Sequence, residues 1–236
     1  MVSVLITGAS RGIGAAAARA FARAGYSLML LARSSTSFEE LVVELRSSAA
    51  SVVTAEVDLS DPVAVAPAIT SLLSRGGTPD VVVNNAGAAY TGSLASMPLE
   101  HWQWLLQLNL TSVFQVTQAV LPSLRERGRG LIVNVSSHAA RQAFAEWGAY
   151  CVSKAALQSF SRCLAEEERP HGIRVSTLTL GAVDTPLWDS QTVDSSFDRR
   201  AMLSADQAAA ALLYLAGQPD HQVVEDLTLM PAAGAL

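Results

Sequence analysis

Apolar runs alternate with helical patterns along almost the whole chain, and this alternation restricts the fold more than any other feature. The runs that favour β-strands lie at residues 2–6, 27–32, 51–57, 80–84, 130–135, 173–179 and 224–230. The helical patterns lie between them, at residues 12–24, 37–48, 61–75, 98–127 (as two segments), 149–169 and 204–216. Such alternation is typical of βαβ units, whose right-handed crossovers build a parallel sheet with helices on both faces. The sequence therefore predicts an α/β fold with a doubly wound, seven-stranded parallel sheet.

The composition favours one domain over two. Of the 236 residues, 50% are hydrophobic and 16% are charged, which suits a core on both faces of a sheet. No linker rich in Pro, Gly or Ser, no repeat and no charge run divides the chain. We therefore expect residues 1–236 to form a single domain.

Three of the helical segments carry start signals. Ser37 with Glu40 and Ser204 with Gln207 have the spacing of capping boxes. Ser60-Asp61-Pro62 is typical of a cap followed by an early proline. Each signal predicts the first turn of a helix.

Charge, hydropathy and cysteine usage exclude several classes of protein. The net charge of −5 argues against a nucleic-acid partner, which requires a basic face, and no apolar stretch approaches the roughly 20 residues of a membrane span. The chain enters a strand at once without a charged leader, so we expect a cytoplasmic protein. Cys151 and Cys163 would lie about 18 Å apart on one helix. No intrachain disulfide is therefore expected.

A glycine-rich segment follows the first apolar run. Thr7-Gly8-Ala9-Ser10-Arg11-Gly12-Ile13-Gly14 lies between that run and an Ala-rich helical segment. Strand, glycine turn and helix form a phosphate-binding arrangement, because glycines admit a pyrophosphate and the helix N-terminus supplies amide donors. The spacing is GxxxGxG rather than the common GxGxxG, so this segment alone is a weak signal.

A second pattern lies in the helical segment 149–169. Tyr150 and Lys154 are four residues apart, so they share one helix face. A nearby ammonium favours the phenolate, and we expect it to lower the pKa of Tyr150 toward the working range of a general acid or base. Ser137 is a candidate for holding a carbonyl oxygen beside this phenol.

These motifs, together with others in the same order, resemble the short-chain dehydrogenase/reductase family. The matching segments are TGASRGIG at 7–14, Val57-Asp58-Leu59, Asn84-Asn85-Ala86-Gly87, Asn109, Ser137, Tyr150 with Lys154, and Gly181-Ala182-Val183-Asp184-Thr185. The resemblance spans nearly the whole chain. It implies a Rossmann-type domain with a cofactor half at about residues 1–130, a catalytic and substrate half at about 131–236, and oxidoreductase activity.

The resemblance also implies roles for the catalytic residues. Tyr150 would exchange a proton with the substrate oxygen, and Ser137 would hydrogen-bond that oxygen, with Ser136 as the second choice. Lys154 would lower the Tyr150 pKa and hold the nicotinamide ribose, and Asn109 would complete a water-linked relay to Lys154. No His or Cys cluster has metal-ligand spacing, so no metal is expected.

The end of the second strand favours NADP(H) over NAD(H). NAD-preferring sites place an acidic residue about 20 residues beyond the glycines. Ala32 occupies that place here, and Arg33 and Arg11 offer guanidinium groups for a 2′-phosphate. The other interpretation is that both arginines are solvated surface residues.

The cofactor contacts implied by the family motifs extend along most of the chain. Asp58 would contact the adenine edge, although a turn acid before Ser60 is an alternative role. Leu180 stands where the family usually has Pro, which affects the contacts of Val183 and Thr185. The complete set of expected cofactor residues is Gly8, Ser10, Arg11, Gly12, Ile13, Gly14, Arg33, Asp58, Leu59, Asn85, Ala86, Gly87, Tyr150, Lys154, Val183 and Thr185.

The substrate is expected to be a small or medium carbonyl or alcohol compound in a largely apolar pocket. Segment 186–203 would cover it, and no arginine obviously marks a carboxylate site, although Arg141, Arg199 and Arg200 lie in the right regions. The ending from Val224 to Pro231 resembles the branch that oxidises serine and related 3-hydroxy acids. The candidate lining residues, each of which has local packing as its alternative role, are Tyr90, His138, Phe144, Trp147 and Trp188.

Family members commonly pair the helices at 110–126 and 150–168 across a subunit interface, so a homodimer or homotetramer is expected. Two other functions stay open on the same fold. One is a non-catalytic NADP(H)-sensing protein. The other is an epimerase or dehydratase that uses a bound cofactor.

Overall fold

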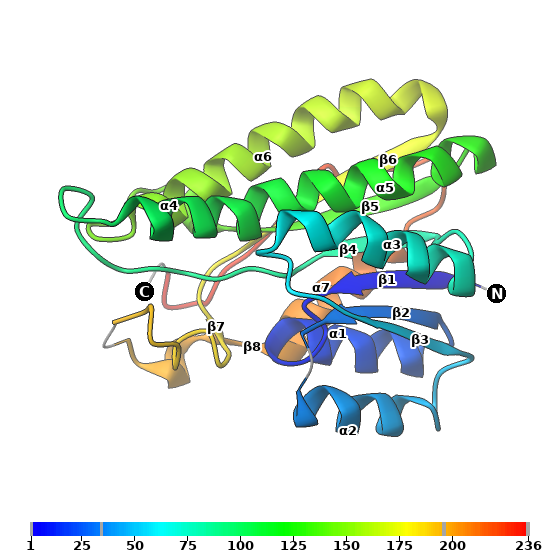
Figure 1. Ribbon diagram of the computed structural model, residues 1–236, viewed down its shortest axis with the longest axis horizontal. Helices are drawn as coiled ribbons and strands as arrows, with labels where there is room; N and C mark the ends of the chain where they lie inside the picture. The colour runs from blue at the N-terminus through cyan, green and yellow to red at the C-terminus, as the bar shows by residue number, and fades with distance from the viewer. Residues whose placement is uncertain (1, 34, 195–196, 235–236) are drawn as a thin grey trace.

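Seven parallel strands form the central sheet of this computed structural model, which describes residues 2–33, 35–194 and 197–234 (Figure 1). The strand order is β3-β2-β1-β4-β5-β6-β9, so the direction of winding reverses between β1 and β4. A parallel sheet binds ligands outside the carboxyl ends of its strands at this switch point. The strands are β1 (Ser3–Thr7), β2 (Ser27–Ala32), β3 (Val52–Glu56), β4 (Val81–Asn84), β5 (Gly130–Ser137), β6 (Ile173–Leu180) and β9 (Asp226–Leu229).

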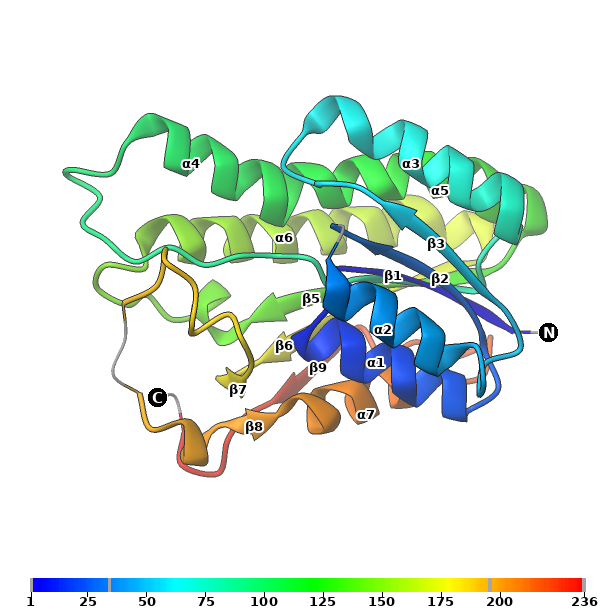
Figure 2. The ribbon, with the colours of Figure 1, turned by 60° about the horizontal axis from the view of Figure 1, so that its bottom comes forward.

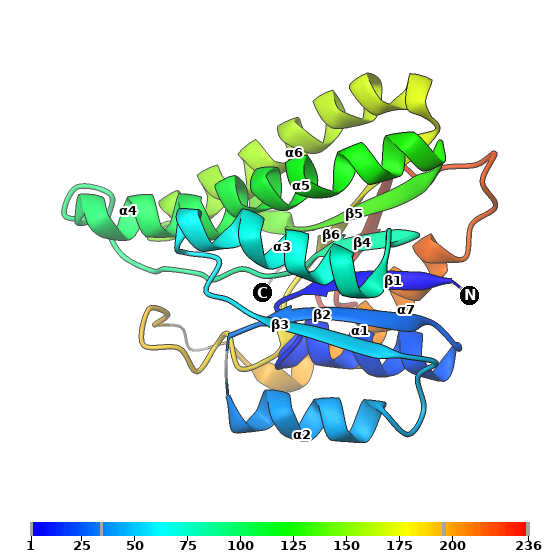
Figure 3. The same cartoon turned by 45° about the vertical axis from the view of Figure 1, so that its right-hand side comes forward.

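Helices cover both faces of the sheet (Figure 3). One face carries α1 (Gly12–Arg23), α2 (Thr36–Leu45) and α7 (Ala205–Ala216), and the other carries α3 (Pro62–Gly76), α4 (Leu99–Leu106), α5 (Ser112–Arg127) and α6 (Gly148–Glu168). Strand β1 is buried on both sides: Val4 and Ile6 face the first helix layer, and Leu5 faces the second. This two-sided burial explains the continuous apolar runs of the strands.

The predicted α/β fold with its seven-stranded sheet is confirmed. Strand β5 continues through Ser137, two residues beyond the predicted end, and carries that hydroxyl to the edge of the sheet. The expected division of the helical region 98–127 into two segments is confirmed, since α4 and α5 are separate helices. The π-helix between them, Gln107–Thr111, was not predicted. A two-strand pair, β7 (Val183–Asp184) and β8 (Leu203–Ser204), was also not predicted. It lies in the segment after β6, beyond the carboxyl ends of the central strands (Figure 2).

Two of the three predicted helix starts are confirmed, and one is wrong. Ser204 and Gln207 form the capping box of α7, and Asp61 caps α3 ahead of Pro62. The capping box at Ser37 does not form, because α2 begins earlier and the Ser35 hydroxyl accepts from the Phe38 amide at 3.3 Å. Both cysteines are free, and no helix in the described part of the chain is long and apolar enough to cross a membrane.

Gly14 makes the tightest helix–strand contact near the switch point. A Cβ at this position would lie 2.1 Å from the Gly8 carbonyl oxygen and 2.7 Å from Asn85 Nδ2. Gly14→Ala should therefore lower the free energy of unfolding by about 1–3 kcal/mol, the usual cost of overpacking. Urea unfolding measures this change. Gly217→Ala is the matched control, because its Cβ would meet nothing closer than 3.4 Å, and an equal loss in both variants would contradict the packing argument.

Candidate active site

Two adjoining cavities lie at the carboxyl edge of the sheet. The larger, about 470 Å³, extends from the glycine loop to the ends of β2 and β3. The smaller, about 160 Å³, lies between the end of β5, the start of α6 and the segment after β6. Asn85, Gly87 and Thr185 line both cavities, so the two form one continuous cleft.

The glycine loop leaves room for a phosphate group. Gly8 and Gly12 have φ angles of +67° and +53°, which side-chain-bearing residues rarely adopt. The side chain of the N-cap residue, Arg11, makes no capping hydrogen bond to α1, so the first amide groups of this helix are available to an anion. A Cβ at Gly12 would lie 3.3 Å from the Thr185 side chain, across the mouth of the cleft. This cradle therefore fits the pyrophosphate of a dinucleotide cofactor.

Hydrogen bonds join the glycine loop to the end of β4. Thr7 Oγ1 accepts from the amides of Asn85 and Ala86, each at 3.0 Å. Asn85 Nδ2 donates to the carbonyls of Thr7, at 3.0 Å, and Gly8, at 3.3 Å. Asn85 thereby positions the loop at the switch point.

The far end of the larger cavity is lined by Arg11, Ala32, Arg33, Asp58 and Leu59. Within residues 2–33, 35–194 and 197–234, neither arginine forms an ion pair, and both are exposed. Asp58 lines the cleft, while its Oδ1 also accepts from the Ser60 amide and hydroxyl at 2.9 and 2.7 Å. Two exposed guanidinium groups beside the non-acidic Ala32 suit a phosphate-bearing ribose.

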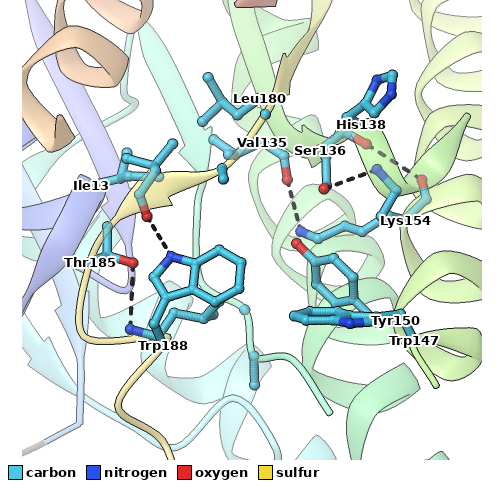
Figure 4. A pocket seen from close by; sticks show the side chains of 18 of the residues that line it. Ile13, Val135, Ser136, His138, Trp147, Tyr150, Lys154, Leu180, Thr185 and Trp188 are labelled. Carbon is cyan, nitrogen blue, oxygen red and sulfur yellow. Dashed lines mark hydrogen bonds between the residues drawn. The ribbon is translucent and has the colours of Figure 1, made fainter. Parts of the chain in front are cut away.

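Strand β5 and helix α6 bring the polar residues together at the inner end of the smaller cavity (Figure 4). Lys154 Nζ donates to the Val135 carbonyl at 3.0 Å. Ser136 is buried and directs its hydroxyl to the Lys154 carbonyl at 3.5 Å, whereas Ser137 is partly exposed to the cleft. This difference in exposure favours Ser137 over Ser136 as the substrate contact.

Burial shifts the pKa values of Tyr150 and Lys154. Desolvation in the cleft raises the pKa of the Tyr150 hydroxyl, and a hydrogen bond with Ser137 opposes the increase. Desolvation also lowers the pKa of Lys154 to about 8. The prediction that Lys154 lowers the Tyr150 pKa is therefore wrong. The ammonium lies 5.9 Å from the phenol ring centroid and bonds to the Val135 carbonyl instead.

Asn109 lies in the π-helix and is fully buried. Its Oδ1 accepts from the Ala88 amide at 2.9 Å, and its Nδ2 donates to the Ala88 carbonyl at 2.9 Å and to Ser153 Oγ at 3.0 Å. A Cβ on Gly87 would lie 3.1 Å from Asn109 Oδ1 and 3.6 Å from Lys154 Nζ. Asn109 thus fastens the loop after β4 beside Lys154, and Gly87 keeps the space between them open.

Four of the five candidate substrate residues line the smaller cavity: His138, Phe144, Trp147 and Trp188. Tyr90 does not line it, because its ring packs against His101 with centroids 5.0 Å apart. Leu180, which the sequence analysis named only as a departure from the family motif, also lines the cavity. Among the large apolar residues that line it, the sequence did not single out Leu187, Phe197 and Met230.

The expected cofactor residues have three different positions. Tyr150, Lys154 and Val183 line only the smaller cavity, and Gly14 supports the loop from behind. The expected residues that line the larger cavity are Gly8, Ser10, Arg11, Gly12, Ile13, Arg33, Asp58, Leu59, Asn85, Ala86, Gly87 and Thr185.

No group of three or more His, Cys, Asp or Glu residues able to hold a metal ion occurs within the described ranges.

Lys154 should make the stability depend on pH. Its pKa falls from 10.5 to about 8 on folding, so between these values the unfolded chain binds more protons. The free-energy cost of burying the Lys154 ammonium is therefore fully present below pH 8 and decreases as the pH rises. The free energy of unfolding should increase by about 2 kcal/mol between about pH 8 and about pH 9.5. Urea unfolding measures this increase, and it should disappear in Lys154→Met. A full increase in that variant would assign it to another group.

Comparison with known proteins identifies the family. The short chain dehydrogenase family model matches residues 3–195. Sepiapterin reductase of Chlorobaculum tepidum is 33% identical, with 98% of this chain and 96% of that protein covered. Serine 3-dehydrogenase of Rhizobium radiobacter is 31% identical, with 97% and 93% covered.

A solved structure agrees with this assignment. An alcohol dehydrogenase from the archaeon Thermococcus sibiricus, complexed with 5-hydroxy-NADP, superposes with a TM-score of 0.90 at 33% identity, covering 100% of this chain and 99% of that one. Fold, motif order and sequence relatives lead to the same conclusion: the chain belongs to the short-chain dehydrogenase family of oxidoreductases.

Proposed function

We propose that this protein is an NADP(H)-dependent oxidoreductase that interconverts a carbonyl group and a secondary alcohol in a small or medium substrate. One observation carries the proposal. The Tyr150 and Ser137 hydroxyls line the smaller cavity together with the Lys154 side chain, at the inner end of a cleft that begins at a phosphate cradle. In this proposal, a proton donor and an oxygen-binding hydroxyl would adjoin the groove for the cofactor.

The proton chemistry falls to Tyr150. Because burial raises its pKa, the phenol carries its proton at neutral pH and can donate it to a substrate oxygen during reduction. In oxidation the same oxygen would accept the proton. The Ser137 hydroxyl holds the substrate oxygen as charge develops on it. The nicotinamide, when bound, supplies or accepts the hydride.

Lys154 and Asn109 support the proton transfer by Tyr150. With a pKa of about 8, Lys154 exchanges its proton near neutral pH more readily than an ordinary lysine does. In the proposed complex its ammonium would hold the ribose of the cofactor. Asn109 keeps the loop after β4 in place beside it.

The preference for NADP(H) rests on the exposed arginines at the end of the larger cavity. Arg11 and Arg33 would grip the 2′-phosphate, and Ala32 leaves no carboxylate to repel it. The complex of the Thermococcus sibiricus relative with 5-hydroxy-NADP supports this preference.

We also propose a homodimer or homotetramer built through α5 and α6. Phe114 on α5 and Val152 on α6 are exposed, and the Phe114 ring packs on Phe160 of α6, so the two helices share one apolar surface. The cytoplasmic location stays a prediction from the sequence.

Tyr150→Phe should remove the proton donor while leaving the groove intact. We expect kcat for carbonyl reduction to fall by about 10²–10⁴-fold, the usual contribution of general acid catalysis. NADPH oxidation across a panel of carbonyl compounds measures activity, and fluorescence titration with NADPH measures binding. Unchanged NADPH affinity is the expected control. Substantial residual turnover would contradict the assigned role, and a wild-type protein that binds NADPH without any turnover would favour the sensing function.

Arg33→Ala should distinguish the two cofactors. Loss of a charged hydrogen bond to the 2′-phosphate should weaken NADPH binding by about 10–100-fold and leave NADH binding nearly unchanged. Isothermal titration with each cofactor gives both affinities. Arg23→Ala, at the exposed end of α1, is the matched control. Equal losses for NADPH and NADH would contradict a 2′-phosphate contact.

A further inference from the structure

Four aromatic rings form a continuous row along the smaller cavity. We name the row by its members in order: Tyr150, Trp147, Trp188 and Phe197. Successive ring centroids are 5.6, 5.8 and 5.4 Å apart, and each pair meets edge to face (Figure 4 shows the first three). The row therefore leads from the proposed proton donor outward to the segment after β6.

The indole Nε1 of Trp188 already has a hydrogen-bond partner. Its Nε1 donates to the Val183 carbonyl at 2.8 Å, which fixes the indole and leaves its ring atoms facing the cavity. Leu180, Leu187 and Met230 line the same cavity. Besides the substrate-oxygen site, the polar side chains that line this cavity are those of Asn85, Ser136, His138 and Thr185. Its other side chains are aliphatic or aromatic, which suits a flat apolar group.

The arginines nearest the substrate side are engaged by carboxylates. Arg141 pairs with Asp226 at 2.7 Å. Arg199 bridges Asp184 and Asp189, and Arg200 pairs with Asp198 at 3.1 Å. None of these three arginines lines the smaller cavity.

Two further donors of the cavity, Lys154 and His138, also have hydrogen-bond partners. Lys154 is the one cationic side chain among the described lining residues, and its Nζ bonds to the Val135 carbonyl at the catalytic end. His138 Nε2 bonds to the Gln142 side chain at 2.9 Å. A substrate carboxylate would therefore lose its hydration in this cavity and meet no cation except Lys154, which is buried and already hydrogen-bonded, and this exchange is unfavourable.

We propose that the preferred substrate is a neutral carbonyl compound with an aromatic ring beside the carbonyl, and that carboxylate-bearing compounds are rejected. This inference rests on the proposed function. In reduction, the carbonyl carbon gains a hydride and its oxygen gains the Tyr150 proton, while NADPH is oxidised to NADP⁺. Solvent then restores the proton to Tyr150. The ring of the substrate lies against Trp147 and Trp188, which hold the carbonyl toward Tyr150. Serine, which is named as the substrate of one relative, has no aromatic ring and carries a carboxylate.

The test uses four substrates that vary the ring and the charge independently: methyl benzoylformate, benzoylformate, methyl pyruvate and pyruvate. The kcat/KM of methyl benzoylformate should exceed that of benzoylformate by about 100-fold, because the carboxylate is buried unpaired. It should exceed that of methyl pyruvate by at least about tenfold, because the ring contacts the aromatic row. A preference for either acid would overturn the charge argument. A preference for methyl pyruvate would overturn the role of the aromatic row.

A binding measurement separates this inference from the proposed function. Quenching of tryptophan fluorescence in the presence of NADP⁺ gives the affinity of each of the four compounds without turnover. If no compound is reduced yet methyl benzoylformate binds most tightly, the proposed function fails and the inferred ligand class holds. Equal affinities for the ester and its acid would overturn the inference whether or not turnover occurs.

Two substitutions test the residues themselves. Trp188→Ala should lower the kcat/KM for methyl benzoylformate by at least about tenfold and change that for methyl pyruvate by less than about threefold. Phe197→Arg places a cation at the outer end of the row, where the side chain is 36% exposed. It should shift the ester-to-acid ratio toward the acid by about tenfold.

Tyr214→Arg, on α7 at a site that is 54% exposed, is the matched control for charge and should leave the ratio unchanged. The inference is wrong if Phe197→Arg leaves the ratio unchanged or if Tyr214→Arg shifts it equally.

Discussion

The cleft depends on the close approach of α1 to the ends of β1 and β4. Gly14 admits this approach, because any side chain there would collide with the Gly8 carbonyl. Thr7 and Asn85 then connect the two strand ends through four hydrogen bonds. The winding of the sheet reverses at this point, so the space above it is not covered by a crossover helix. A small residue on α1 and short hydrogen bonds between the two strand ends thus shape the cleft at this point.

The second half of the chain places the side chains of Ser137, Tyr150 and Lys154 in this cleft, and the burial of Tyr150 and Lys154 costs solvation free energy. Strand β5 delivers Ser137 and α6 delivers Tyr150 and Lys154, and the two elements are held together where Lys154 bonds to the Val135 carbonyl. Burial moves both pKa values toward the neutral forms, up for the phenol and down for the ammonium. The site therefore holds a protonated phenol beside an amine that gives up its proton more readily than an ordinary lysine does.

Local patterns predicted the fold and most of the candidate site because each depends on few neighbours. Buried strands must be apolar, and Tyr150 and Lys154 share a helix face through their spacing alone. The patterns failed where tertiary contacts decide. Ser35 rather than Ser37 caps α2. The π-helix at Asn109 leaves no periodic signature, and Phe197 reaches the cavity only through the path of the segment after β6, of which residues 195 and 196 lie outside the described residues. Tyr90 lies in the expected loop but turns to His101.

In the proposed reaction, hydrogen passes directly from NADPH to a substrate carbon, and isotope labelling tests this transfer. The purified protein would be supplied with NADPH that carries deuterium at both positions of the reactive nicotinamide carbon and with methyl benzoylformate, and the alcohol product examined by mass spectrometry and NMR. Direct transfer predicts one deuterium per product molecule, located on the carbinol carbon, and no label there from D₂O. Consumption of the doubly deuterated NADPH without label at that carbon would contradict direct transfer.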